Sequence, residues 1–271
     1  MLIGLASTKG SPGVTSTALT LAAVWPRPVV LLEADAAGGD LAYRARAAHG
    51  GPVSAHSGLL RLASELRGGT PDADAITGQA QLLACGVSLV PGVSCAAQTR
   101  GMGGIWSTIA GACTVAQVDV LADLGRLERG SPLMPLAAAS HFLLPVASAT
   151  LESVMHLSES LTDLMGALMI DGPATIVPLL VGPDTHAARD CADLDDVLAR
   201  AGMPTEPTLP IPHDPKALAR LEQGEQATGR LGRTLLLRAA RAVTTALLGT
   251  TTDTATATGT GTGTQTGVGA A

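Results

Sequence analysis

The stretch STKGSPGVTSTALTLA, residues 7–22, carries the strongest fold signal in the chain. A short apolar run, residues 2–6, precedes it, and helical spacing begins near Thr15. In a loop between a strand and a helix, Gly10 and Gly13 permit backbone N–H groups to surround phosphate oxygens. The positive helix end favours the same anion, and Thr15 or Ser16 would supply a hydroxyl ligand for Mg²⁺. The alternative is an ordinary glycine-containing turn between a strand and a helix.

Apolar runs and helical segments alternate along the rest of the chain. Runs that are apolar throughout are typical of parallel strands covered by helices on both faces. The alternation therefore predicts an α/β fold with a doubly wound, mostly parallel sheet of about seven strands. The expected strands are residues 2–6, 29–32, 87–90, 118–122, 142–146, 176–181 and 208–211, and the expected helices are residues 15–24, 58–66, 105–116, 151–165, 187–201, 215–222 and 230–248.

Composition narrows the class of protein. Of the 271 residues, 46% are hydrophobic and 15% charged, which excludes a wholly disordered chain. The net charge of −6 argues against a strongly basic nucleic-acid binder, so DNA binding is not supported. Four scattered cysteines without a C-x-x-C pair indicate reduced thiols. With no secretory signal and no apolar run of the ~18–20 residues that span a membrane, a cytoplasmic location is expected.

The chain divides into two predicted parts. Residues 1–248 are predicted to form one domain around the candidate phosphate-binding loop. Gly249 is followed by TTTDTATATGTGTGTQTGVGAA, a Thr/Gly/Ala-rich tract without large apolar side chains. Such a tract cannot offset the entropy cost of ordering, so residues 249–271 are predicted to be a disordered tail.

Two further segments place acids at strand ends. VVLLEADAAGGDLAYR, residues 29–44, puts Glu33 and Asp35 after an apolar run. VDVLADLGR, residues 118–126, puts Asp123 in the same position. Acids at the carboxyl ends of parallel strands face the ligand crevice of such folds. The alternatives are a solvated acidic turn for the first segment and a capped strand end for the second.

These motifs together resemble the ParA/MinD family of partitioning ATPases. The family carries a deviant Walker A motif, K-G-G-x-G-K-T-[ST], where this chain reads KGSPGVTS over residues 9–16. Ser11 replaces a glycine, and Val14 replaces the lysine that touches the β- and γ-phosphates. GDLA, residues 39–42, is similar to the CpaE/TadZ branch, which localises pili, and residues 119–126 are similar to the family's D-x-V-x-x-D-x-G-R.

The resemblance implies a fold of the P-loop NTPase type that binds ATP and Mg²⁺. Lys9 would reach the phosphates of a second subunit, and Asp35 would position the attacking water. Thr15 and Asp123 would hold Mg²⁺. LPIPHDPKAL, residues 209–218, resembles the loop that lies against the adenine, although a proline-rich turn before a helix has the same pattern. The implied nucleotide-contacting residues are Gly10, Ser11, Pro12, Gly13, Val14, Thr15, Ser16, Pro212, His213 and Asp214.

The implied function is that of a nucleotide-dependent homodimer that organises other components in space, in partitioning, septum placement or pilus and secretion localisation. Its partner would be a secretion or pilus ATPase or another polar or septal protein. Because Val14 removes a phosphate-binding charge, ATP hydrolysis is expected to be very slow or absent. The alternatives are a non-catalytic scaffold with the same fold and a metabolic ligase or synthetase.

The segment RLGRTLLLRAARAVTTALL, residues 230–248, has two interpretations. A basic amphipathic helix could lie on a membrane surface, as in MinD relatives. A last helix packed on the sheet, with its arginines pointing outward, has the same pattern. The packed helix is favoured, because the following residues offer no bulky apolar side chains for insertion.

Overall fold

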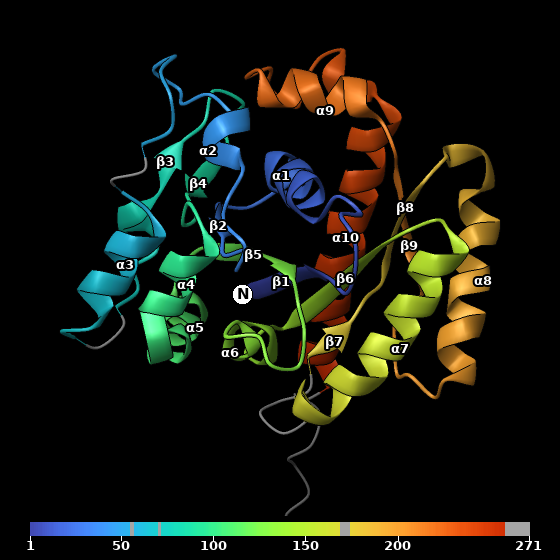
Figure 1. Cartoon of the computed structure of the whole chain (residues 1–271). Coiled ribbons are helices and arrows are strands. Elements are labelled where there is room, and N and C mark those ends of the chain that lie inside the picture. Colours follow the sequence, from blue (N-terminus) through green and yellow to red (C-terminus); the bar gives the residue numbers. More distant parts are fainter. Residues whose placement is uncertain (55–56, 70–71, 169–173, 258–271) are drawn as a thin grey trace, which may run out of the picture.

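The computed structural model describes residues 1–54, 57–69, 72–168 and 174–257, and its centre is a single β-sheet (Figure 1). The nine strands of the described residues follow the order β3-β4-β2-β5-β1-β6-β8-β9, with β7 beside β6. All pairings are parallel except β3 with β4. The strands are β1 Leu2–Ser7, β2 Val29–Glu33, β3 Gln81–Leu82, β4 Ser88–Val90, β5 Asp119–Arg126, β6 Phe142–Ser148, β7 Thr175–Ile176, β8 Leu179–Gly182 and β9 Leu209–Pro212.

The predicted doubly wound, mostly parallel α/β fold is confirmed, with two differences in the strands. The expected strand 176–181 is divided into β7 and β8. Pro178 lies between them and has no N–H to donate to a neighbouring strand. The edge strand β3 was not expected, since two residues are too few to show an alternating pattern.

Helices cover both faces of the sheet. Successive side chains of β1 point to opposite faces, so Ile3 and Leu5 join one buried cluster and Leu2 joins the other. α1 and α10 complete the first cluster, and α3, α5 and α6 complete the second (Figure 1). The helices are α1 Val14–Val24, α2 Leu41–Arg44, α3 Leu59–Leu66, α4 Ala96–Met102, α5 Trp106–Val115, α6 Met134–Ala138, α7 Leu151–Leu168, α8 Ala187–Arg200, α9 Pro215–Glu222 and α10 Leu235–Ala257.

The last helix is packed against the sheet and α1. Its buried leucines, Leu236, Leu237 and Leu247, belong to the same cluster as α1. This arrangement agrees with the packed-helix interpretation of residues 230–248. α10 continues to Ala257, so it overlaps the start of the predicted tail, whereas residues 258–271 of that tail lie outside the described residues. Within the described ranges, no helix is both long and apolar enough to cross a membrane.

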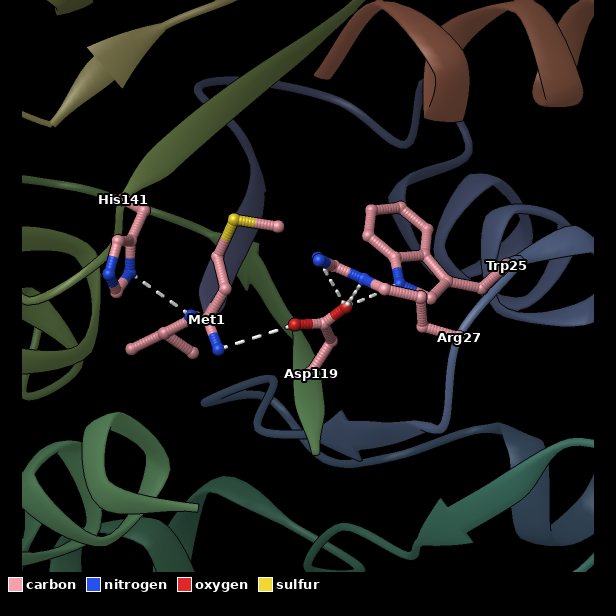
Figure 2. Close-up of polar contacts among 6 residues, drawn as sticks. Met1, Trp25, Arg27, Asp119 and His141 are labelled. Carbon is pink, nitrogen blue, oxygen red and sulfur yellow. Dashed lines mark hydrogen bonds and ion pairs between the residues drawn. The ribbon is translucent and has the colours of Figure 1, made fainter. Parts of the chain in front are cut away.

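A buried polar cluster joins strands at the amino-terminal edge of the sheet (Figure 2). Asp119, the first residue of β5, is 7% exposed. Its carboxylate accepts a hydrogen bond from Trp25 Nε1 at 2.8 Å and pairs with Arg27 Nη2 at 2.8 Å. The Met1 amino group lies 3.3 Å from the other carboxylate oxygen. Asp119 matches the first acid of the motif D-x-V-x-x-D-x-G-R, but these contacts give it a structural role.

Candidate functional site

The loop that joins β1 to α1 has the geometry of an anion-binding turn. Gly13 caps α1 with φ 98°, a left-handed conformation that side chains disfavour, and Gly10 has φ 72°. The first amide groups of a helix have no partner within it, so they are free to bind an anion. The first turn of α1 carries no acidic residue that would weaken this potential.

A cavity of ≈ 480 Å³ opens beside this loop. Its size lies in the usual range for small-molecule sites, about 300–1,000 Å³. One wall comes from the loop and the start of α1, and another from the end of β9 and the turn into α9. The cavity therefore brings together seven of the predicted nucleotide contacts, namely Ser11, Pro12, Gly13, Ser16, Pro212, His213 and Asp214.

Two walls of the cavity were not assigned from the sequence. Residues 148–150 comprise the last residue of β6 and the turn after it, and residues 181–183 lie at the end of β8. Both sit at the carboxyl edge of the sheet, and this position is the signal that could have identified them. Asp214 caps α9, because its Oδ1 accepts the N–H of Ala217 at 2.9 Å. The interpretation of this segment as a turn before a helix therefore holds for the Asp214 side chain.

Glu33 lies inside the protein and orders the backbone around the site. It is 1% exposed and pairs in register with Asp123 across β2 and β5. Its carboxylate accepts the N–H of Leu41 at 2.8 Å and of Gly92 at 2.9 Å. Burial raises the pKa of Glu33, while these backbone N–H groups oppose the shift. Glu33 therefore fixes the segments after β2 and β4.

Asp123 is the acid best placed to serve a cation. It is fully buried, and its Oδ1 accepts the N–H of Gly125 at 3.0 Å. Its Oδ2 has no hydrogen-bond partner among the described residues. Burial raises the pKa of Asp123 to about 7, and the Thr15 hydroxyl and the Gly125 N–H oppose the shift. The charges of Glu33 and Asp35 raise it further.

These groups fit Mg²⁺. The orphaned Asp123 oxygen and the neighbouring Thr15 hydroxyl are both hard oxygen ligands. In the described part of the chain, no three His, Cys, Asp or Glu side chains are grouped to hold a metal by themselves. Mg²⁺ does not require such a cage, since it usually keeps several waters and binds phosphate oxygens.

Asp35 lies beside Asp123. A Cβ atom added to Gly125, whose φ is 57°, would overlap the Asp35 carboxyl group, so this side chain rests against the backbone that follows Asp123. Asp35 Oδ1 also accepts the N–H of Ala37 at 2.7 Å. Partial burial raises the pKa of Asp35. Both Asp35 and Asp123 therefore stand at the carboxyl edge of the sheet, as the sequence predicted.

Neither Lys9 nor Val14 places a charge in the cavity. Lys9 is exposed, and its Nζ lies 2.8 Å from Nε2 of His156 on α7. Val14 is 6% exposed and packs into the core cluster with α1 and α10. The Val14 side chain, at the position where the deviant Walker A motif has a lysine, therefore packs in the core.

No protein-family model and no curated protein matches this chain. Its fold is shared with solved structures. A ParA family ATPase from Chlorobium tepidum TLS is 16% identical, with a TM-score of 0.68 over 90% of this chain and 98% of that chain. The septum site-determining protein MinD complexed with Mg-ADP from Pyrococcus horikoshii OT3 is 17% identical, with a TM-score of 0.62 over 89% and 95%.

A third similar structure is an enzyme, cobyrinic acid a,c-diamide synthase from Mycobacterium smegmatis. It is 19% identical, with a TM-score of 0.55 over 92% of this chain and 93% of that chain. At these identities the likeness defines the class of fold, which is the P-loop NTPase type. The predicted fold type is confirmed.

Proposed function

We propose that this protein is a ParA/MinD-like ATP-binding protein of the CpaE/TadZ kind, a nucleotide-dependent dimer that positions a pilus, secretion, septal or partitioning component. The arrangement of one cavity carries the proposal. The glycine loop and residues 212–214, predicted to contact the base, both line it. The orphaned Asp123 oxygen lies near Thr15, which directly precedes the cavity-lining Ser16. The similarity to a MinD structure with Mg-ADP supports the same ligand class.

The proposed roles of the side chains are those that the family resemblance implies. Thr15 and Asp123, the latter through water, would hold Mg²⁺, which when bound neutralises phosphate charge. The loop amides 10–16 would bind the phosphates, and Pro212, His213 and Asp214 would contact the base. Asp35 would orient a water, and Lys9 would reach the phosphates of a second subunit.

Hydrolysis is expected to be very slow or absent. Phosphoryl transfer depends on positioned positive charge, and the loss of one such donor commonly costs ~10²–10³ in rate. Val14 contributes no charge, and its buried side chain leaves that part of the loop apolar. The acids of the site can orient a water but cannot replace a cation.

The experiment that tests the proposal is calorimetric titration of the folded protein with ATP and with ADP in the presence of Mg²⁺. We expect saturable binding that weakens when Mg²⁺ is chelated. Absence of binding at millimolar nucleotide, with circular dichroism showing a folded protein, would mean that Gly10 and Gly13 are turn residues only.

Two alternatives predict different binding or turnover. A non-catalytic scaffold would dimerise with weak nucleotide binding or without turnover. A metabolic ligase or synthetase, for which the fold similarity to the cobyrinic acid a,c-diamide synthase is the favouring observation, would turn over ATP only with a second substrate. Isotope exchange between ADP and ATP, measured with candidate acids and amines, separates the last case.

A further inference from the structure

We propose that Arg44, at the end of α2, is the phosphate-binding cation of this site, in place of the lysine that Val14 replaces. The inference rests on the proposed function and adds a residue to it. Arg44 Nη2 donates a hydrogen bond to Ser16 Oγ at 3.0 Å. Ser16 lies in the first turn of α1 and lines the cavity. The guanidinium is therefore one hydrogen bond away from the surface that would receive the phosphates.

The site has a deficit of positive charge that Arg44 is placed to correct. Among the described residues that line the cavity, none is lysine or arginine. Val14 is buried in the core, and Lys9 contacts His156 on α7. The buried Asp123, whose Oδ2 has no hydrogen-bond partner among the described residues, adds an acid and not a cation to the site. A polyphosphate needs a compensating cation, and the loop amides supply only partial charges.

Contacts within the protein hold the Arg44 side chain in place and leave some of its donors available. Its side chain is 33% exposed and forms an ion pair with Glu222 of α9, whose side chain is 16% exposed. Of its several N–H donors, only those of Nη2 have partners among the described residues. The remaining donors can bind phosphate oxygens, and a planar guanidinium does so in a bidentate manner.

The position of Arg44 depends on the segment that follows β2. Glu33 accepts the N–H of Leu41, the first residue of α2, and Asp35 belongs to the same segment. The loop that carries the predicted water-orienting acid thus also carries the cation. Glu222 is the competing anion, because it binds the same Nη2 atom that contacts Ser16.

A second role for Arg44 is structural, since it joins α1, α2 and α9. Two substitutions separate the roles. Arg44→Gln removes the cation, and Glu222→Gln removes the competing anion while leaving Arg44 in place. A structural bridge predicts that both variants have the same effect. A phosphate contact predicts that Arg44→Gln lowers nucleotide affinity and that Glu222→Gln does not.

The experiment is calorimetric titration of the full chain with Mg-ADP and with adenosine. Arg44→Gln should weaken Mg-ADP binding by about 10–100-fold and leave adenosine binding unchanged, because a charge-assisted hydrogen bond is lost. Glu222→Gln should retain or increase Mg-ADP affinity. Arg46→Gln is the matched control, since Arg46 is exposed and makes no side-chain hydrogen bond or ion pair with other described residues.

The outcomes are distinct. If the wild type binds Mg-ADP and Arg44→Gln binds it as tightly as Arg46→Gln, the inference is wrong and the proposed function stands. If Arg44→Gln and Glu222→Gln lose affinity equally, Arg44 is a structural bridge and the inference is again wrong. If the wild type binds no nucleotide at all, the proposed function fails, and the role of Arg44 fails with it.

Discussion

At the scale of single residues, Asp123 is expected to lower the free energy of unfolding while it supplies a ligand for Mg²⁺. Its Oδ2 is buried with no hydrogen-bond partner in the described part of the chain, which is unfavourable for a carboxylate in the absence of a cation. Asp123→Asn should therefore raise the free energy of unfolding at pH 8 by about 1–3 kcal/mol and abolish the Mg²⁺ dependence of nucleotide binding. Urea denaturation and calorimetry measure the two effects.

Asp119→Asn is the matched control on the same strand. Asp119 has cationic and indole partners, so its substitution should lower the free energy of unfolding by about 1–3 kcal/mol and leave nucleotide binding unchanged. If both variants changed the free energy of unfolding in the same direction, the structural role given to Asp119 and the cation-binding role given to Asp123 would not be distinguished.

Val14 is expected to limit both binding and turnover. Val14→Lys should restore a charge to the loop and increase nucleotide affinity or hydrolysis, by about 10-fold or more. The same change should cost about 1–3 kcal/mol of stability, because the valine side chain leaves the core. Calorimetric titration measures the nucleotide affinity, a coupled phosphate-release assay the hydrolysis rate, and thermal melting the stability. No gain in either binding or rate would contradict the role given to this position.

His141 is expected to make stability depend on pH. Its Nδ1 accepts the N–H of Leu2 at 3.2 Å (Figure 2), and burial, together with the charge of the Met1 amino group, lowers its pKa below 6.5. Because the unfolded chain takes up this proton first, the stabilising contribution is complete above pH 6.5 and is lost as the pH falls below it.

The measurement for His141 is a comparison with His141→Gln, which keeps a hydrogen-bond acceptor but does not titrate. The wild type should lose urea stability relative to this variant between pH 7.5 and pH 5. Taking the difference between the two proteins cancels the contributions of Asp123 and the other acids. Parallel curves would exclude His141 as the titrating group.

At the scale of secondary-structure elements, α10 is a structural helix. Leu237 is fully buried, whereas Leu235 on the same helix is 49% exposed. Leu237→Ala should cost about 2–5 kcal/mol of unfolding free energy, and Leu235→Ala should cost well under 1 kcal/mol. Denaturant titration of the two variants measures the difference. Equal costs would mean that α10 does not pack against α1 as described.

At the scale of the whole molecule, Lys9 is expected to act between subunits. Its contact with His156 involves exposed groups and contributes little to the fold. Lys9→Ala should therefore reduce ATP-dependent dimer formation without lowering the melting temperature. Multi-angle light scattering with and without ATP measures the mass, and His156→Ala, which releases Lys9 without removing it, is the control.

An unchanged mass would contradict the role given to Lys9. If the mass is the same with and without ATP in the wild type and in Lys9→Ala, then Lys9 does not act across an interface. The contact with His156 would then be its principal interaction.

Much of this protein could be predicted from local sequence. The strand, glycine loop and helix over residues 2–24 depend on neighbouring residues, because backbone hydrogen bonds, helix ends and left-handed glycines are local properties. The alternation of apolar runs with helical segments likewise determined the parallel α/β class, and acids at strand ends indicated the edge where Asp35 and Asp123 meet.

Only the tertiary structure decided which side chains became partners. Asp119 and Asp123 stand on one strand and look alike in sequence. Asp119 contacts Arg27 and Trp25, whereas one buried oxygen of Asp123 has no hydrogen-bond partner among the residues that the structure describes. Arg44 meets Ser16 across 28 positions and Glu222 across 178. Such pairings depend on how strands are ordered and helices packed, and those long-range contacts leave no periodic trace in the sequence.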